Sequence, residues 1–75
     1  MQRTNLKLAI VGKGFHHWQL AVETNRHLPS EQFLSELNIT QFVTFRKNPT
    51  PEQAAALAHV LGQSVIELFS PEVKQ

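Results

Sequence analysis

Apolar residues recur at helical spacing along most of the chain. The clearest case lies within SELNITQFVTFRKN, residues 35–48, where Ile39, Phe42 and Val43 fall at positions i, i+3 and i+4. This spacing places the three side chains on one side of an α-helix. We therefore predict a helix over residues 35–46 that turns these residues inward.

The opposite side of this predicted helix carries short polar or methyl-bearing side chains. Side chains of this kind can read base edges in a DNA major groove. The candidate base-reading residues are Leu37, Thr40, Gln41 and Thr44. Arg46 and Lys47 follow directly and suit DNA phosphates. The alternative is an amphipathic helix whose polar side faces water and whose last two cations favour the helix dipole.

A first helix is predicted from Asn5, because Leu6, Ala9 and Ile10 share helical spacing and the glycines at 12 and 14 end the run. Residues 1–4 before it are predicted to form a flexible arm. A second helix begins near residue 16 and ends between residues 25 and 28, before Pro29.

In the second helix the sequence places Trp18, Ala21 and Val22 on one face. The segment that follows, residues 30–34, has two interpretations. It forms a separate helical turn capped by Ser30, or it continues into the helix capped by Ser35. The sequence leaves both open.

Capping signals are strongest in the last third of the chain. Thr50 and Gln53 form a capping box with Pro at the first helical position, and Gly62 occupies the position that ends this helix. Leu57, Ala58 and Leu61 of this helix are expected to face inward. These signals predict a fourth helix over residues 51–61.

A second capping box, Ser64 with Glu67, predicts a short fifth helix. Its Val65, Leu68 and Phe69 are expected to cover the base of the core, and residues 70–75 follow as a polar tail. Five short helices and no comparable strand predict a single all-α domain over residues 1–75.

Composition limits the classes of function. The chain has 75 residues, no cysteine and a net charge of +1, so disulfides and thiolate metal sites are excluded. It has no apolar run long enough to cross a membrane and no signal-peptide pattern. We therefore expect a cytoplasmic protein without a membrane partner. The small basic excess is weak support for a nucleic-acid partner.

Catalytic and metal chemistry find little support. The sequence has no nucleophile motif, no glycine-rich phosphate loop and no carboxylate pair of arguable placement. The four histidines show no HxxxH or HExxH spacing. We expect no enzyme activity, no cofactor and no metal.

The order of these elements, and above all TPEQAAALAHVLGQSVIELF over residues 50–69, resembles the Cro/repressor-like (Xre) helix-turn-helix family. The resemblance covers roughly residues 6–69. It implies a compact five-helix, lambda-repressor-like fold in which the helix around residues 35–46 enters the major groove. His16 and His17 fall where the family often has Thr-Gln, so the resemblance implies that they contact DNA phosphate, more strongly when protonated.

The sequence departs from the family at two places. The family's turn between its second and third helices has about three or four residues, and this chain has roughly eight more between Asn25 and Leu34. Phe45 stands where the family usually has the glycine that closes the recognition helix. The Phe45 ring is expected to be partly exposed or to pack on the inserted segment.

The resemblance implies a sequence-specific regulator of transcription that binds double-stranded DNA as a homodimer. A rival interpretation is a protein-interaction module on the same scaffold, such as an antitoxin-like or accessory subunit. In that case Phe33, Phe45 and the inserted segment form an apolar docking patch for a protein partner.

Overall fold

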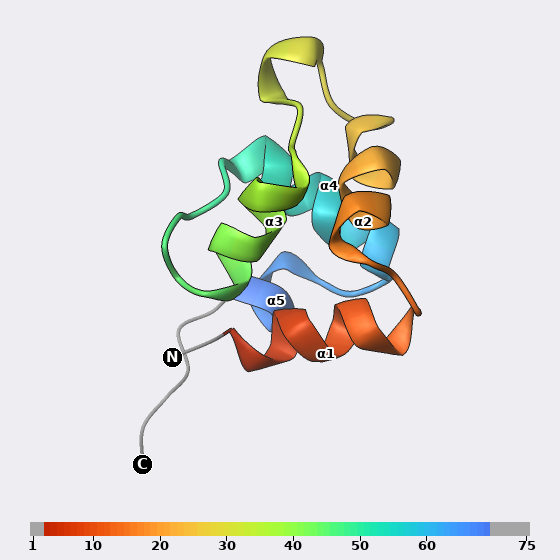
Figure 1. The fold of residues 1–75 in the computed structure, drawn as a ribbon, viewed down its shortest axis with the longest axis vertical. Coiled ribbons are helices and arrows are strands. Elements are labelled where there is room, and N and C mark those ends of the chain that lie inside the picture. Colours follow the sequence, from red (N-terminus) through yellow and green to blue (C-terminus); the bar gives the residue numbers. More distant parts are fainter. Residues whose placement is uncertain (1–2, 70–75) are drawn as a thin grey trace.

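The protein forms a small bundle of short α-helices, as the sequence predicts. A computed structural model describes residues 3–69. Within that range there are five α-helices, one 3₁₀ turn and no strand (Figure 1). The elements are α1 (Thr4–Gly12), α2 (His17–Asn25), η1 (Ser30–Gln32), α3 (Glu36–Val43), α4 (Pro51–Leu61) and α5 (Val65–Phe69).

The predicted capping boxes are present. Thr50 Oγ1 accepts from the Gln53 N–H at 3.2 Å, and Gln53 Oε1 accepts from the Thr50 N–H at 3.0 Å. Ser64 and Glu67 form the same reciprocal pair at 3.1 and 3.0 Å. Gly62 closes α4 with a φ of +71°, the left-handed conformation that glycine adopts without strain.

A third capping box starts α3. Ser35 Oγ accepts from the Asn38 N–H at 3.2 Å, and Asn38 Oδ1 accepts from the Ser35 N–H at 2.9 Å. The helix is shorter than the predicted range 35–46, because it ends at Val43 and Phe45 turns into the left-handed region with a φ of +63°. A backbone in that conformation cannot continue a right-handed helix.

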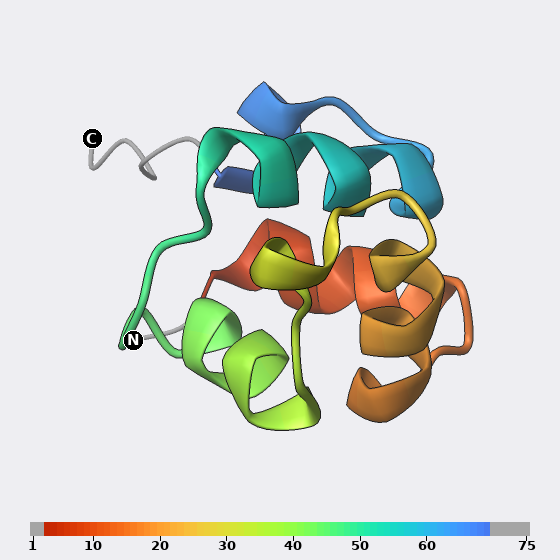
Figure 2. The ribbon, with the colours of Figure 1, turned by 90° about the horizontal axis from the view of Figure 1, so that it is seen from above.

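The core lies where α2 packs against α3 and α4, and α1 and α5 close its base (Figures 1 and 2). Its most deeply buried apolar side chains come from all of the four longer helices: Leu6, Ile10, Leu20, Ile39 and Leu57. The inward faces predicted for α3 and α4 are confirmed, since Ile39, Phe42 and Val43 and also Leu57, Ala58 and Leu61 are buried.

The apolar face predicted for α2 is only partly buried, and the predicted inward face of α5 is partly wrong. On α2, Trp18 and Val22 are 53% and 49% exposed, whereas Leu20, Ala21 and Thr24 are buried. The Leu20 side is the one that packs against α3 and α4. In α5, Leu68 is buried but Val65 is exposed.

The inserted segment is a loop with one separate 3₁₀ turn. In Figure 1 it projects from the end of the molecule opposite α1. Asn25 holds its base with two hydrogen bonds to the main chain of Leu34, at 3.0 and 2.7 Å. Gln32 is held from α4, because the Gln53 amide donates to its carbonyl and the Thr50 hydroxyl donates to its side chain, both at 3.0 Å. The insertion is therefore fixed at both ends.

The predicted flexible arm over residues 1–4 needs correction. Thr4 already belongs to α1, and Arg3 is 8% exposed with its N–H donating to Val43 O at 2.7 Å. Residues 1–2 and the predicted polar tail over 70–75 lie outside the described residues. None of the helices within residues 3–69 has the length and apolar character needed to cross a membrane.

Candidate functional site

The outer side of α3 carries the four candidate base-reading residues. Leu37 is 63% exposed, and Thr40, Gln41 and Thr44 are half-buried. Thr44 lies just beyond the last helical residue. All four are thus accessible, and Leu37 projects furthest into solvent.

The two threonine hydroxyls are already engaged within the protein. Thr44 Oγ1 donates to Thr40 O at 2.9 Å, and Thr40 Oγ1 donates to Glu36 O at 3.2 Å. Bonds of this kind to the preceding turn use the one hydroxyl proton that a threonine has. The threonines therefore offer acceptor lone pairs and methyl groups to a ligand.

Gln41 is a weakly paired polar group on this side of α3. Among the described residues, its Oε1 receives only a long contact of 3.5 Å from Asn38 Nδ2, so most of its hydrogen-bonding capacity remains available. Glu36, in the first turn, is exposed on the same helix. It was not among the residues predicted from the sequence, although its position four residues before Thr40 is the signal that places both on one side.

The first turn of α2 lies beside α3. His16 caps α2, and its N–H donates to Gln19 Oε1 at 2.8 Å. His17 Nδ1 lies 2.9 Å from Thr40 Oγ1. This contact holds the His17 ring against α3, and which of the two groups donates depends on the ring tautomer.

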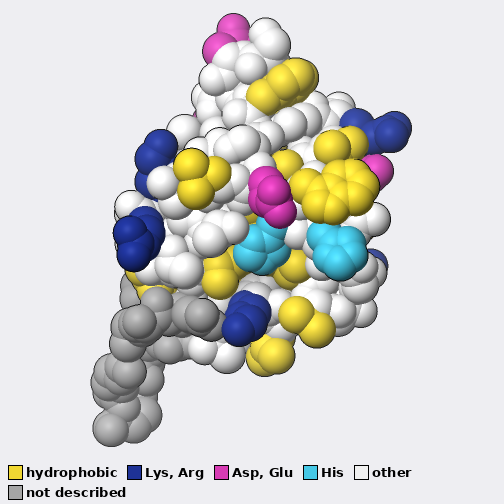
Figure 3. Space-filling view, in the orientation of Figure 1, with side chains coloured by type: hydrophobic (Ala, Val, Ile, Leu, Met, Phe, Trp, Pro, Cys, Tyr) yellow, Lys and Arg dark blue, Asp and Glu magenta, His cyan; other side chains and the backbone are white. Residues whose placement is uncertain are grey.

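Arg46 and Lys47 extend into solvent from the turn that closes α3. Their N–H groups both donate to Gln41 O, at 2.9 and 3.2 Å, and their side chains are exposed. Figure 3 shows basic side chains over the loop that follows α3, with histidine side chains and an acidic side chain nearer the middle of the same face. The charge on this face is therefore mixed.

Phe45 occupies the left-handed position that closes α3 and is 41% exposed. Its ring packs against the Arg3 guanidinium, with Cζ 4.4 Å from the ring centroid. The expectation that the Phe45 ring is partly exposed is confirmed, and its partner is Arg3.

Arg3 is a structural residue that sequence reasoning missed. Its guanidinium donates to Phe42 O, to Lys47 O at 3.2 Å and to Asn48 Oδ1, and it also faces the Phe69 ring at 5.6 Å. Burial lowers the pKa of Arg3 from its ordinary value, but an arginine keeps its proton across the physiological pH range. Nothing in the sequence around this single cation near the start of the chain indicates that its side chain binds the end of α3.

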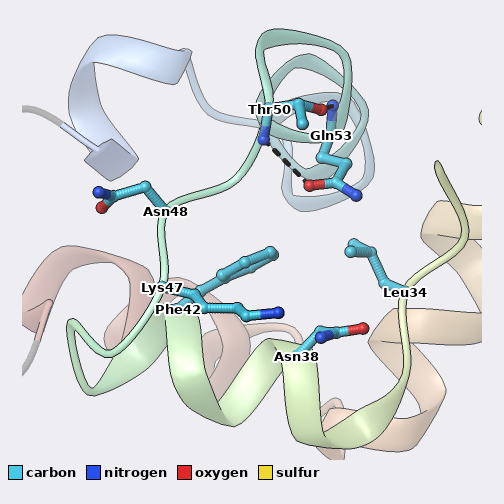
Figure 4. A pocket seen from close by; sticks show the side chains of 7 residues that line it. All are labelled: Leu34, Asn38, Phe42, Lys47, Asn48, Thr50 and Gln53. Atoms are coloured by element: carbon cyan, nitrogen blue, oxygen red, sulfur yellow. Dashed lines mark hydrogen bonds between the residues drawn. The ribbon is translucent and has the colours of Figure 1, made fainter.

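A pocket of about 430 Å³ lies between α3, α4 and the loop that joins them (Figure 4). Its lining combines two apolar side chains with one cation and several amide or hydroxyl groups. The lining residues are Leu34, Asn38, Phe42, Lys47, Asn48, Thr50 and Gln53. This pocket was not predicted from the sequence.

Comparison of the chain with protein-family models, curated proteins and solved structures gives no match. The resemblance to the Cro/repressor-like family therefore stays a prediction from the residues quoted above.

The structure also brings together two histidines, His27 and His59, whose ring centroids lie 4.8 Å apart. Within residues 3–69, no group of three or more His, Asp or Glu side chains is arranged to hold a metal ion.

Proposed function

We propose that this protein binds duplex DNA sequence-specifically and regulates transcription as a repressor-like helix-turn-helix protein. The observation that carries the proposal is the outer side of α3, where Leu37 and Gln41 are accessible beside the first turn of α2. An α-helix with its side chains is about 10 to 12 Å in diameter. α3 therefore fits a major groove that is about 12 Å wide.

The proposed base contacts follow from the free groups on α3. The Gln41 amide suits a bidentate contact with adenine, and the Leu37 methyls suit a thymine methyl. Thr40 and Thr44 add methyl contacts, because their hydroxyl groups are already hydrogen-bonded within the protein. Glu36 can accept a hydrogen bond from the cytosine amino group, which would offset part of its repulsion from phosphates.

The proposed phosphate contacts lie on both sides of α3. Arg46 and Lys47 follow its last turn, and His16 and His17 begin α2. The start of α4 would add the Glu52 N–H, because Pro51 has none and the Gln53 N–H is bonded to Thr50. Phosphate contacts fix the register of a protein on DNA, while base contacts give the specificity.

With so few charges per chain, we propose a homodimer on a two-fold site with half-sites about one helical turn apart. α5 supports this proposal because Val65 and Ile66 are exposed, apolar and adjacent. Sedimentation of the wild type and of Ile66→Lys tests the interface. We expect the wild type to sediment as a dimer and Ile66→Lys to sediment as a monomer. A wild type that is monomeric at the concentrations that saturate DNA contradicts the proposed homodimer.

The DNA proposal is tested by titrating a pool of random duplexes, followed by sequencing of the bound fraction. We expect enrichment of a two-fold related sequence. We also expect an affinity that falls steeply between about 50 mM and about 200 mM salt, because phosphate contacts release counterions. Absence of binding at the lower salt concentration rules the proposal out.

A second candidate, the protein-interaction module, is favoured by Phe33, which is exposed on the inserted segment. Phe45 does not strengthen that patch, because Arg3 packs on its ring. A Phe33→Ser variant that keeps full DNA affinity and sequence preference favours DNA binding as the function of this face. The module gains support only if DNA binding is absent.

A further inference from the structure

The pocket between α3 and α4 combines an apolar wall with a cationic edge. Phe42 and Leu34 supply the apolar part, and both are buried residues whose side chains border the pocket. Among residues 3–69, Lys47 supplies the one charge of the lining, and no acidic residue lines it. An anionic ligand would therefore meet attraction without a competing carboxylate.

Two hydrogen-bond donors converge at this edge. Figure 4 shows the Lys47 side chain extending past Phe42 so that its ammonium faces the Asn38 amide. Asn38 Oδ1 accepts from the Ser35 N–H at 2.9 Å, which turns Nδ2 the other way. Among the described residues, no acceptor pairs with the Lys47 ammonium, and Asn38 Nδ2 has only its long contact to Gln41.

The opposite wall of the pocket has little hydrogen-bonding capacity left. Thr50 and Gln53 bond to each other and to Gln32. Asn48 points away from the pocket in Figure 4, and its Oδ1 accepts from Arg3. The free donors are thus concentrated at Lys47 and Asn38, next to the apolar wall.

We propose that this pocket binds a small carboxylate with an apolar body. The carboxylate would bridge the Lys47 ammonium and the Asn38 amide, and the body would lie on Phe42 and Leu34. A volume of about 430 Å³ lies within the range of small-molecule sites. A bare inorganic anion would satisfy the two donors but make no apolar contact with the edges of Phe42 and Leu34, so it should bind more weakly.

The site also has a consequence that rests on the proposed function. Lys47 is one of the proposed phosphate contacts, and it cannot grip DNA while it holds a carboxylate. A bound ligand should therefore weaken DNA binding, which makes the pocket a regulatory site. Ligand binding itself requires no DNA and can be measured on the free protein.

The experiment is a titration followed by ¹H–¹⁵N NMR with phenylacetate as the probe. Phenylacetamide is the neutral control, and inorganic phosphate is the anion without an apolar body. We expect the side-chain amide signals of Asn38 and Gln53 to shift with phenylacetate, with a Kd on the order of 1 mM for a ligand of this size. Both controls should bind more weakly.

Lys47→Gln removes the charge and keeps a polar, unbranched side chain one atom shorter, and Lys13→Gln removes an exposed cation outside the pocket. Lys47→Gln should weaken phenylacetate binding about three- to fivefold, and Lys13→Gln should leave it unchanged. Equal binding of phenylacetamide, an equal loss in both variants, or no shift at Asn38 overturns the proposal. If phenylacetate binds as expected but no DNA binds at low salt, the ligand site stands and the DNA proposal fails.

Discussion

The guanidinium of Arg3 donates a hydrogen bond to the main-chain oxygen of Phe42, 39 residues further along the chain. The carbonyls at the end of a helix carry partial negative charge, so a buried cation at this end of α3 is compensated. The same guanidinium holds Lys47 O and the Asn48 side chain. Arg3 therefore fixes the turn from which Arg46 and Lys47 project.

Arg3→Met should lower the free energy of unfolding by about 2 to 3 kcal/mol, because it removes charge-assisted hydrogen bonds to buried acceptors. Urea denaturation at neutral pH measures the change. Arg26→Met is the matched control, since Arg26 is exposed and, among the described residues, pairs only with Glu23 at 3.4 Å. It should change stability by less than about 0.5 kcal/mol. Similar losses in both variants contradict the role of Arg3.

The left-handed conformation of Phe45 predicts an unusual order of stability between two variants. Phe45→Ala and Phe45→Gly both lose the ring, but only glycine adopts a φ of +63° without strain. Phe45→Gly should be more stable than Phe45→Ala by about 1 kcal/mol. At Ala55, an exposed position inside α4, Ala→Gly should instead cost about 1 kcal/mol. Chemical denaturation of the wild type and the three variants measures their free energies of unfolding and checks the sign of each difference.

The hydroxyl of Thr24 is completely buried and has no hydrogen-bond partner within the described residues. Thr24→Val keeps the shape of the side chain and removes the unpaired hydroxyl, so it should stabilise the fold by about 1 kcal/mol. The same change at Thr50 removes the cap of α4 and should cost about 1 kcal/mol. Thr24→Val should therefore raise Tm and Thr50→Val should lower it. A shift of Tm in the same direction for both variants contradicts the predicted effect of the unpaired Thr24 hydroxyl.

Gln41→Ala tests base reading by α3. Once a preferred duplex is known, the variant should lose about 1 to 3 kcal/mol of discrimination at one base pair and keep its preference elsewhere. Gln63→Ala, in the exposed turn after α4, is the control and should bind like the wild type. Unchanged discrimination in Gln41→Ala removes Gln41 from the list of base readers.

Arg46→Gln should weaken binding to all duplexes alike and reduce the slope of log K against log salt by about 1, as expected for one lost phosphate contact. Arg26→Gln, which removes a cation at the end of α2, should leave the slope unchanged. Fluorescence anisotropy over a series of salt concentrations provides the measurement. A slope in Arg46→Gln equal to that of the wild type shows that Arg46 does not grip phosphate.

Local chemistry predicted the fold well because capping and helix termination depend on neighbouring residues. Thr50 with Gln53, Ser64 with Glu67, and Gly62 each act within one helical turn, and each is found as expected. The inward residues of α3 and α4 followed in the same way from helical spacing. The all-α class needed nothing beyond these local signals.

The candidate site was less predictable, because its properties depend on contacts between residues far apart in the sequence. Thr40 is a polar residue on an outer helix face in the sequence, but the structure engages its hydroxyl with Glu36 and His17. The pocket likewise needs α3, α4 and the inserted segment to meet. No spacing rule connects Leu34, Lys47 and Gln53.

The sequence by itself determined that this chain folds into short helices and where most of them begin and end, because those signals act over three or four residues. Tertiary structure decided which side of α2 is buried, how Phe45 and Arg3 close α3, and how the insertion is fastened through Asn25 and Gln32. These outcomes depend on packing and hydrogen bonds across the bundle, which the order of residues does not reveal.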